Sequence, residues 1–95
     1  MPTSPVERIA EIAWALSDPT RLALARCLVK RGRLHVGALA QAIGTRPAHA
    51  CHHLRLLLRS RLVSTRREGR LVLYSLAHPD LAAVLKLLEE IAAAE

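Results

Sequence analysis

Basic and thiol side chains alternate with apolar ones in the segment from Arg46 to Arg59. With 3.6 residues per turn, a helix over residues 47–59 would separate the two kinds. Its apolar side would consist of Ala50, Leu54, Leu57 and Leu58. The other faces would carry guanidinium and imidazole groups, which donate hydrogen bonds to phosphates and to the edges of bases. The spacing therefore predicts a helix that lies against nucleic acid.

The distribution of charge points to the same class of partner. The formal net charge is +6, but twelve of the fourteen Lys and Arg residues lie between Arg21 and Arg70, together with only one of the eight acidic residues, Glu68. A basic middle segment between acidic ends attracts polyanions. We therefore expect double-stranded DNA as the partner; arginine used only as a solubilising residue is the alternative.

Length and composition restrict the remaining possibilities. The 95 residues suffice for one domain, 52% of them are hydrophobic, and no apolar run approaches the ~20 residues that span a bilayer. The first five residues lack the basic and apolar regions of a signal peptide, so we expect a cytoplasmic protein without membrane contact. No catalytic triad, carboxylate pair in the basic middle or glycine-rich phosphate loop occurs, so we expect neither an enzyme nor a cofactor.

Capping residues and hydrophobic periodicity predict the elements that would position the DNA-facing helix. Proline favours the first turn of a helix and glycine favours its end. In this chain prolines stand near predicted helix starts and glycines just after predicted helix ends. The predicted helices cover residues 5–16, 19–31, 35–43, 47–59 and 79–94. Within residues 36–59, a short helix, a tight turn at Gly44 and Thr45 and a second helix form a predicted helix-turn-helix.

A basic hairpin follows directly, in the position of a wing over residues 62–76. Its strands are predicted at 62–67 and 70–76, joined at Glu68 and Gly69, because glycine supplies the positive φ of a tight turn. The predicted fold is thus mainly α with a β-hairpin wing (α+β), a winged helix-turn-helix domain over residues 1–95. The residues expected to contact DNA are Arg46, Ala48, His49, Cys51, His52, Arg55, Arg59, Arg66, Arg67 and Arg70.

The first and last helices, residues 5–16 and 79–94, are apolar on more than one side. A three-helix core with one hairpin has too little interior to cover both of them. We therefore expect both to pack against a second copy of the chain in a two-fold homodimer, with a tight monomer as the alternative. The expected interface residues are Ile9, Ile12, Trp14, Leu81, Leu85 and Leu88.

Four motifs, in their order and spacing, resemble the ArsR/SmtB family. They are Asp18-Pro-Thr-Arg-Leu22, Val36-Gly-Ala-Leu-Ala40, His52-His-Leu-Arg55 and Arg67-Glu-Gly-Arg70, the last followed by Tyr74. The resemblance extends without obvious gaps from about Leu16 to Leu76. It implies a homodimeric winged-helix repressor that leaves its operator when a metal, a metalloid, a sulfur species or another signal reaches the dimer.

Several positions depart from the family pattern. The recognition helix of the family usually opens with Ser-Gln-Ser, where this chain has Arg46, Pro47 and Ala48. The usual serine before the histidine pair is Cys51, and the glycine that often follows the helix is Arg61. The resemblance therefore implies DNA binding but does not carry over the operator sequence of the family.

The metal sites of the family are incompletely matched, so we expect no metal. The Cys-x-Cys pair at the start of the third helix is replaced by His35 and Gly37. On the last helix, His78 and Asp80 stand in swapped order at the first two ligand positions, where we expect them to cap the helix instead. A triplet on the predicted recognition helix, His49, His52 and His53, could gather a metal; we expect His52 to contact DNA and His53 to be half-buried.

Cys27 and Cys51 are too few for a disulfide framework, and we expect free thiols in a reducing cytosol. Both are candidate thiol sensors. Positive neighbours favour the thiolate of Cys51, so its oxidation could place bulk or charge at the DNA surface. The alternatives are that Cys51 merely replaces a serine and that Cys27 belongs to the core.

The sequence thus favours a sequence-specific regulator, expected to be a repressor that binds an inverted repeat with half-sites about one DNA turn apart. A low-specificity architectural DNA-binding protein is the alternative, because Pro47 and Ala48 lack groups that read bases. A module that turns its basic face to an acidic protein is the third hypothesis.

Overall fold

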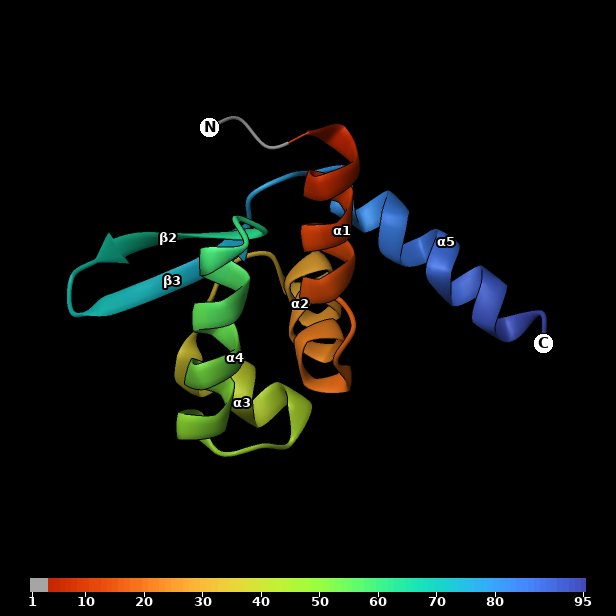
Figure 1. The fold of residues 1–95 in the computed structure, drawn as a ribbon. Coiled ribbons are helices and arrows are strands. Elements are labelled where there is room, and N and C mark those ends of the chain that lie inside the picture. The colour runs from red at the N-terminus through yellow and green to blue at the C-terminus, as the bar shows by residue number, and fades with distance from the viewer. Residues whose placement is uncertain (1–3) are drawn as a thin grey trace.

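The structure is a computed structural model that describes residues 4–95; residues 1–3 of the predicted domain lie outside the described part. The helices are α1 (Pro5–Ala15), α2 (Pro19–Arg31), α3 (Val36–Ile43), α4 (Pro47–Arg59) and α5 (Leu81–Ala93). The strands are β1 (Leu34–His35), β2 (Val63–Glu68) and β3 (Leu71–Leu76). This mainly helical winged helix-turn-helix confirms the predicted fold class (Figure 1).

Side-chain caps set the starts of the first two helices. Ser4 Oγ accepts a hydrogen bond from the Glu7 amide at 3.1 Å, and Asp18 Oδ2 accepts from the amides of Thr20 and Arg21 at 2.9 and 3.1 Å. These bonds satisfy amides that have no partner within the first helical turn. The chain therefore leaves α1 and enters α2 through a fixed, short connection.

The sheet contains one strand that the sequence analysis did not predict. Its order is β1-β3-β2, all antiparallel, with Leu34 opposite Tyr74 and His35 opposite Leu73. β1 has two residues, too few to display the alternation by which a strand is recognised. It ties the wing to the segment between α2 and α3.

The wing also turns one residue later than predicted. Glu68 pairs with Leu71, so the two connecting residues are Gly69 and Arg70. Gly69 has a φ of 60° at the first of these positions, where a type II′ hairpin turn requires glycine.

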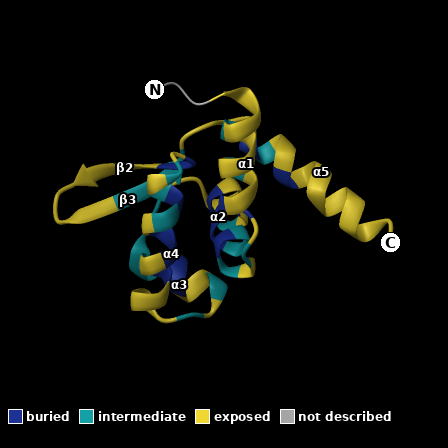
Figure 2. Cartoon of the chain, viewed as in Figure 1, coloured by how far each residue is buried: buried dark blue, intermediate teal, exposed yellow. Residues whose placement is uncertain are grey.

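The core lies between α2, α3, α4 and the base of the hairpin (Figure 2). Its fully buried large side chains are Leu24, Leu28, Leu39, Leu54, Leu57 and Leu62. Helix α5 joins this core through Leu81 and Leu85 and then extends away from the body of the protein (Figures 1 and 2). Among the described residues, no helix combines the length and apolar character needed to cross a membrane.

Candidate nucleic-acid interface

The exposed face of α4 is a continuous stripe. Its residues are Ala48, His52, Arg55 and Arg59, whose spacing of four, three and four residues keeps them on one side of the helix. The opposite side, formed by Ala50, Leu54 and Leu57, is buried in the core. The core thus fixes which side chains α4 presents outward, and three of them are cations or proton-accepting rings.

The beginning of α4 is open to an anion. Arg46 occupies the N-cap position, and its side chain makes no capping hydrogen bond. Pro47 has no amide hydrogen, so the amides that follow it carry the positive end of the helix dipole. Backbone amides at such a terminus bind phosphate, and the Arg46 guanidinium is exposed beside them.

The wing carries a second set of exposed cations. Arg66, Arg67 and Arg70 are all exposed, and Arg66 Nε lies 3.9 Å from Glu68 Oε2. Glu68 also contacts Arg33 Nη1 at 3.6 Å, so the single acidic residue of the basic segment is shared by two cations. The positive charge of the wing therefore exceeds what its own carboxylate neutralises.

Two of the residues predicted to contact DNA, His49 and Cys51, lie on α4 outside the exposed stripe. The His49 ring faces α2, where its Nε2 lies 3.3 Å from Thr20 Oγ1, although His49 remains exposed. Cys51 is half-buried beside Tyr74 of β3. Burial raises the pKa of the Tyr74 phenol, the Cys51 thiol adds to the increase, and Arg55 acts in the opposite direction. Cys51 therefore lies between α4 and the wing instead of on the outward stripe.

Arg59 lies at the far end of the exposed stripe. It lines a groove together with Ser60 and the α1 residues Glu7, Glu11 and Trp14. Since the N-terminal half of a recognition helix makes the base contacts, Arg59 is farthest from them.

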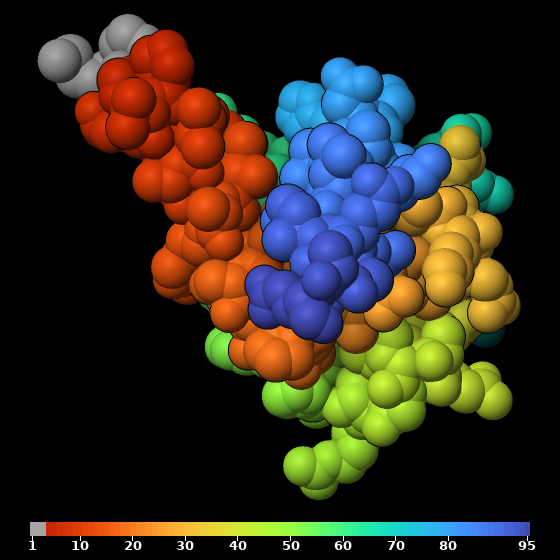
Figure 3. Space-filling view, turned by 90° about the vertical axis from the view of Figure 1, so that its right-hand side faces the viewer, coloured from red at the N-terminus to blue at the C-terminus, as the bar shows by residue number. Residues whose placement is uncertain are grey.

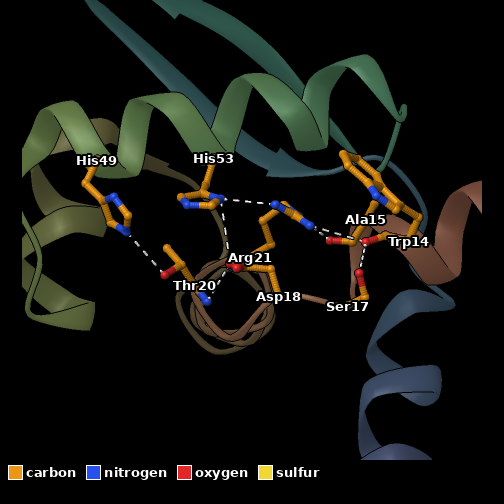
Figure 4. A network of polar contacts seen from close by, with 8 residues as sticks. All are labelled: Trp14, Ala15, Ser17, Asp18, Thr20, Arg21, His49 and His53. Atoms are coloured by element: carbon orange, nitrogen blue, oxygen red, sulfur yellow. Dashed lines mark hydrogen bonds and ion pairs between the residues drawn. The ribbon is translucent and has the colours of Figure 1, made fainter.

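A buried polar network behind α4 was missed by the sequence analysis. Arg21 of α2 is buried and contacts His53 of α4, which is also buried and not half-buried as predicted (Figure 4). The sequence does indicate that Arg21 is buried, because Arg21 lies three, four and seven residues before the core residues Leu24, Ala25 and Leu28. That spacing places Arg21 on the apolar side of α2, whereas its charge alone assigns it to the basic segment.

The network shifts the titration of two of its members. The backbone hydrogen bond from Arg21 is the largest cause that lowers the pKa of Asp18 below its usual 3.8. Burial lowers the pKa of His53 below 6.5, and the charges of His49, Arg21 and His52 lower it further, while Asp18 raises it. The folded chain therefore favours an ionised Asp18 and a neutral His53.

The remaining candidate ligands are scattered. Within residues 4–95, no three His, Cys, Asp or Glu side chains are grouped so that they could hold a metal ion. Asp80 occupies the N-cap position of α5, but its side chain makes no capping hydrogen bond, which corrects the role predicted for it. His78 is exposed. Both cysteines are free, and Cys27 packs against the core.

A separate apolar surface lies on α1 and α5, which share one face of the molecule (Figure 3). Its exposed members include Ile9, Trp14 and Leu88, three of the residues expected at the dimer interface. Leu81 and Leu85 are buried in the chain's own core, so their prediction as interface residues was wrong, and Ile12 is half-buried against that core. Sequence analysis missed the exposed apolar side chains Val6, Val84, Leu87 and Ile91.

Comparisons with known proteins identify similar sequences and similar solved structures. No protein-family model matches the sequence. The chain is similar to the cadmium resistance transcriptional regulatory protein CadC homolog of Staphylococcus aureus, with 44% identity over 68 residues that cover 72% of this chain and 56% of that protein. The chain thus spans about half the length of this relative.

Two solved structures extend the similarity over most of both chains. The crystal structure of NolR from Sinorhizobium fredii has a TM-score of 0.80 and 34% identity, covering 96% of this chain and 95% of that one. The homodimeric winged helix-turn-helix DNA-binding domain of Mb0332 from Mycobacterium bovis has a TM-score of 0.83 and 31% identity, covering 93% and 81%. The shared elements include the helix-turn-helix and the wing described above.

Proposed function

Since this chain belongs to the ArsR/SmtB family of winged helix-turn-helix transcriptional regulators, we propose that it is a sequence-specific DNA-binding repressor. The observation that carries the proposal is the exposed stripe of α4 next to an exposed basic wing. Core residues on the opposite side of α4 hold that stripe outward. The family consists of regulators and not of enzymes.

The geometry supports a specific division of labour on DNA. Helix α4 has 13 residues and would enter the major groove with its N-terminal half toward the bases. Among the stripe residues with donors, His52 and Arg55 lie nearer than Arg59 to the start of α4 and would contact base edges, whereas Arg46 and the first amides of α4 favour phosphate. Arg67 and Arg70 on the wing would hold the neighbouring backbone or minor groove. Phosphate contacts set the register and base contacts set the sequence.

We further propose that the acting form is a homodimer through α1 and α5. The apolar side chains on this face would stay in water in a single copy, although large exposed apolar patches mark interaction surfaces. A two-fold axis through this face would place two copies of α4 on the same side of the dimer. The expected operator is then an imperfect inverted repeat with half-sites about one DNA turn apart.

The direct test is fluorescence anisotropy with a duplex taken from just upstream of the gene for this protein. We expect the chain to bind this duplex at least about 10³-fold more tightly than a scrambled duplex of equal length. Similar affinity for both duplexes, with a steep dependence on salt, would contradict the proposal. Absence of binding to either duplex at ~50 mM salt would exclude DNA as the partner.

The signal that releases the repressor is a separate prediction. A thiol response of Cys51 is supported by its free thiol and by its position between α4 and Tyr74 of the wing. Modification there would act on the packing of the wing against α4. We also propose a cytoplasmic location, since a DNA-binding regulator must reach its operator.

A further inference from the structure

The carbonyl end of α1 is linked to α4 through a single buried side chain, Arg21 of α2 (Figure 4). Arg21 Nε donates to the carbonyl of Ala15 at 2.8 Å, and Nη2 donates to the carbonyl of Trp14 at 3.3 Å. Nη1 lies 3.2 Å from Nδ1 of His53, and the guanidinium also stacks over the Trp14 ring at 4.7 Å. One cation thus contacts both the proposed dimer helix and the proposed recognition helix.

The contact defines the protonation state of His53. Arginine has only donors, so Nδ1 of His53 must be the acceptor and carry no hydrogen. The ring is therefore the neutral tautomer with its proton on Nε2. The same Nδ1 lies 3.6 Å from Oδ2 of Asp18, which accepts the hydrogen bonds that begin α2. Nδ1 thus has a donor on one side and an acceptor on the other.

We propose that Arg21 and His53 are positioning residues that hold α4 at a fixed place relative to α1, and that they do so only while His53 is neutral. The proposal rests on the proposed operator binding and adds a determinant of its affinity. Protonation at Nδ1 would remove the acceptor of the Arg21 hydrogen bond and would place two cations 3.2 Å apart. The ring would then be drawn toward Asp18, and α4 would lose its hydrogen-bonded link through Arg21 to the carbonyl end of α1.

Most of the groups around His53 oppose its protonation. His53 is 9% exposed and Arg21 is 6% exposed, so solvent screens their repulsion poorly. The rings of His49 and His52 lie 4.7 and 5.1 Å from the His53 ring, and positive charge on either of them opposes protonation of His53. Asp18 alone among the groups that face His53 favours its protonation.

The consequence for DNA follows from the dimer. If α1 belongs to the interface, the position of α4 relative to α1 sets the distance between the two recognition helices. A small shift of α4 against α1 then misplaces both helices on half-sites whose spacing is fixed by the DNA turn. Acidification should therefore weaken operator binding, whereas protonation of an exposed histidine next to phosphate should strengthen it.

Protonation of the buried His53 should weaken operator binding and protonation of an exposed histidine should strengthen it, so a variant at an exposed histidine serves as the control. Operator affinity would be measured from pH about 7.5 down to the pH at which nitrogen-15 spectra show the His53 ring protonated, for the wild type, His53→Asn and His52→Asn. Asparagine offers Arg21 an acceptor oxygen close to the place of Nδ1 and does not titrate. We expect the wild-type Kd to rise about tenfold for each pH unit below the pKa of His53, relative to His53→Asn. His52→Asn should show the same rise or a steeper one.

Equal pH dependence of the wild type and His53→Asn would overturn the proposal. A change confined to the thermal midpoint, with Kd unchanged, would also overturn it, because a merely structural contact affects stability alone. Nitrogen-15 spectra of the histidine rings in the free wild type supply a reading that needs no variant. They should show His53 protonated at Nε2 near neutral pH, and a proton on Nδ1 would refute the contact. Absence of operator binding at all of these pH values would instead refute the proposed function.

Discussion

Leu85 and Leu88 lie within one turn of each other on α5, yet Leu85 is 3% exposed and Leu88 is 44% exposed. Leu85 belongs to the core that fastens α5 to the protomer, and Leu88 lies on the apolar face shared with α1. The same substitution at the two positions therefore separates assembly from folding.

Leu88→Asp should yield a folded monomer. The carboxylate remains in water in the single copy, but each chain of the proposed dimer would bury one in the interface. Sedimentation velocity should give the mass of one chain, with a circular dichroism spectrum like that of the wild type. As the matched control, Leu85→Asp should prevent folding, because it buries a charge in the core. A Leu88→Asp variant that stays dimeric would show that α5 does not form the interface.

Arg55→Ala tests whether the exposed stripe of α4 reads bases. If Arg55 donates to a base edge, its loss should weaken operator binding by about 1–3 kcal/mol and leave binding to scrambled DNA nearly unchanged. Anisotropy titrations with both duplexes at one salt concentration measure the difference. An equal loss on the two duplexes would identify a phosphate contact. Arg59→Ala, at the end of the stripe beside α1, serves as the control and should change the specificity ratio little.

Arg61→Gly should stabilise the protein. Arg61 has a φ of 61°, a left-handed conformation that costs a residue with a Cβ roughly 1–2 kcal/mol. Its amide donates to the carbonyl of Leu58 at 2.9 Å, and the amide of Leu62 donates to Leu57 at 3.0 Å, as in a Schellman motif.

Glycine adopts this conformation freely, although it also gains entropy in the unfolded chain, so we expect a net gain of about 0.5–1 kcal/mol. The exposed contact between Arg61 and Glu11, at 4.0 Å, contributes little against this. Urea denaturation measures the change in the free energy of unfolding. Arg61→Ala, which keeps the Cβ and removes the charge, should show no such gain.

Stability should fall in two stages on acidification. The pKa of His53 is lowered from 6.5 by burial, so the unfolded chain takes up the proton first. The stabilisation is complete above pH 6.5 and declines below it, until the folded-state pKa is passed. The pKa of Asp18 is lowered from 3.8 mainly by the Arg21 amide, so its contribution is present above pH 3.8 and is lost as the pH falls through the folded value. Urea midpoints measured across this pH range should show both stages in the wild type and only the second in His53→Asn. If His53→Asn still shows the first stage, that stage belongs to another titratable group.

Oxidation should weaken operator binding if Cys51 is the sensor. Its half-buried thiol lies between α4 and Tyr74, where added bulk would force the wing away from the helix. Diamide together with glutathione, which leaves Cys51 as a mixed disulfide with the tripeptide, should raise the Kd of the wild type and of Cys27→Ser, and a reductant should restore it by releasing glutathione. Cys51→Ser should not respond. If the oxidised and the reduced wild type bind the operator equally well, thiol oxidation is not the signal that releases the protein.

The elements of this protein follow from local features of the sequence. Proline and aspartate at helix starts, glycine at the wing turn and leucine at helical spacing place α4 at the predicted residues 47–59, and the motif order identifies the family. Such features act within one or two helical turns, so they can be recognised in the sequence without knowing which segments pack against them.

Tertiary packing decided what those features leave open. The two-residue strand β1 exists because β3 lies beside it, and Leu81 and Leu85 are core residues because α5 crosses the protomer at its first turns. Arg21 is a buried link and not one more surface cation, because the carbonyl end of α1 and the ring of His53 converge on it. Burial and hydrogen-bond partners depend on which segments meet in space, and periodicity identifies the face of a helix without identifying its neighbour.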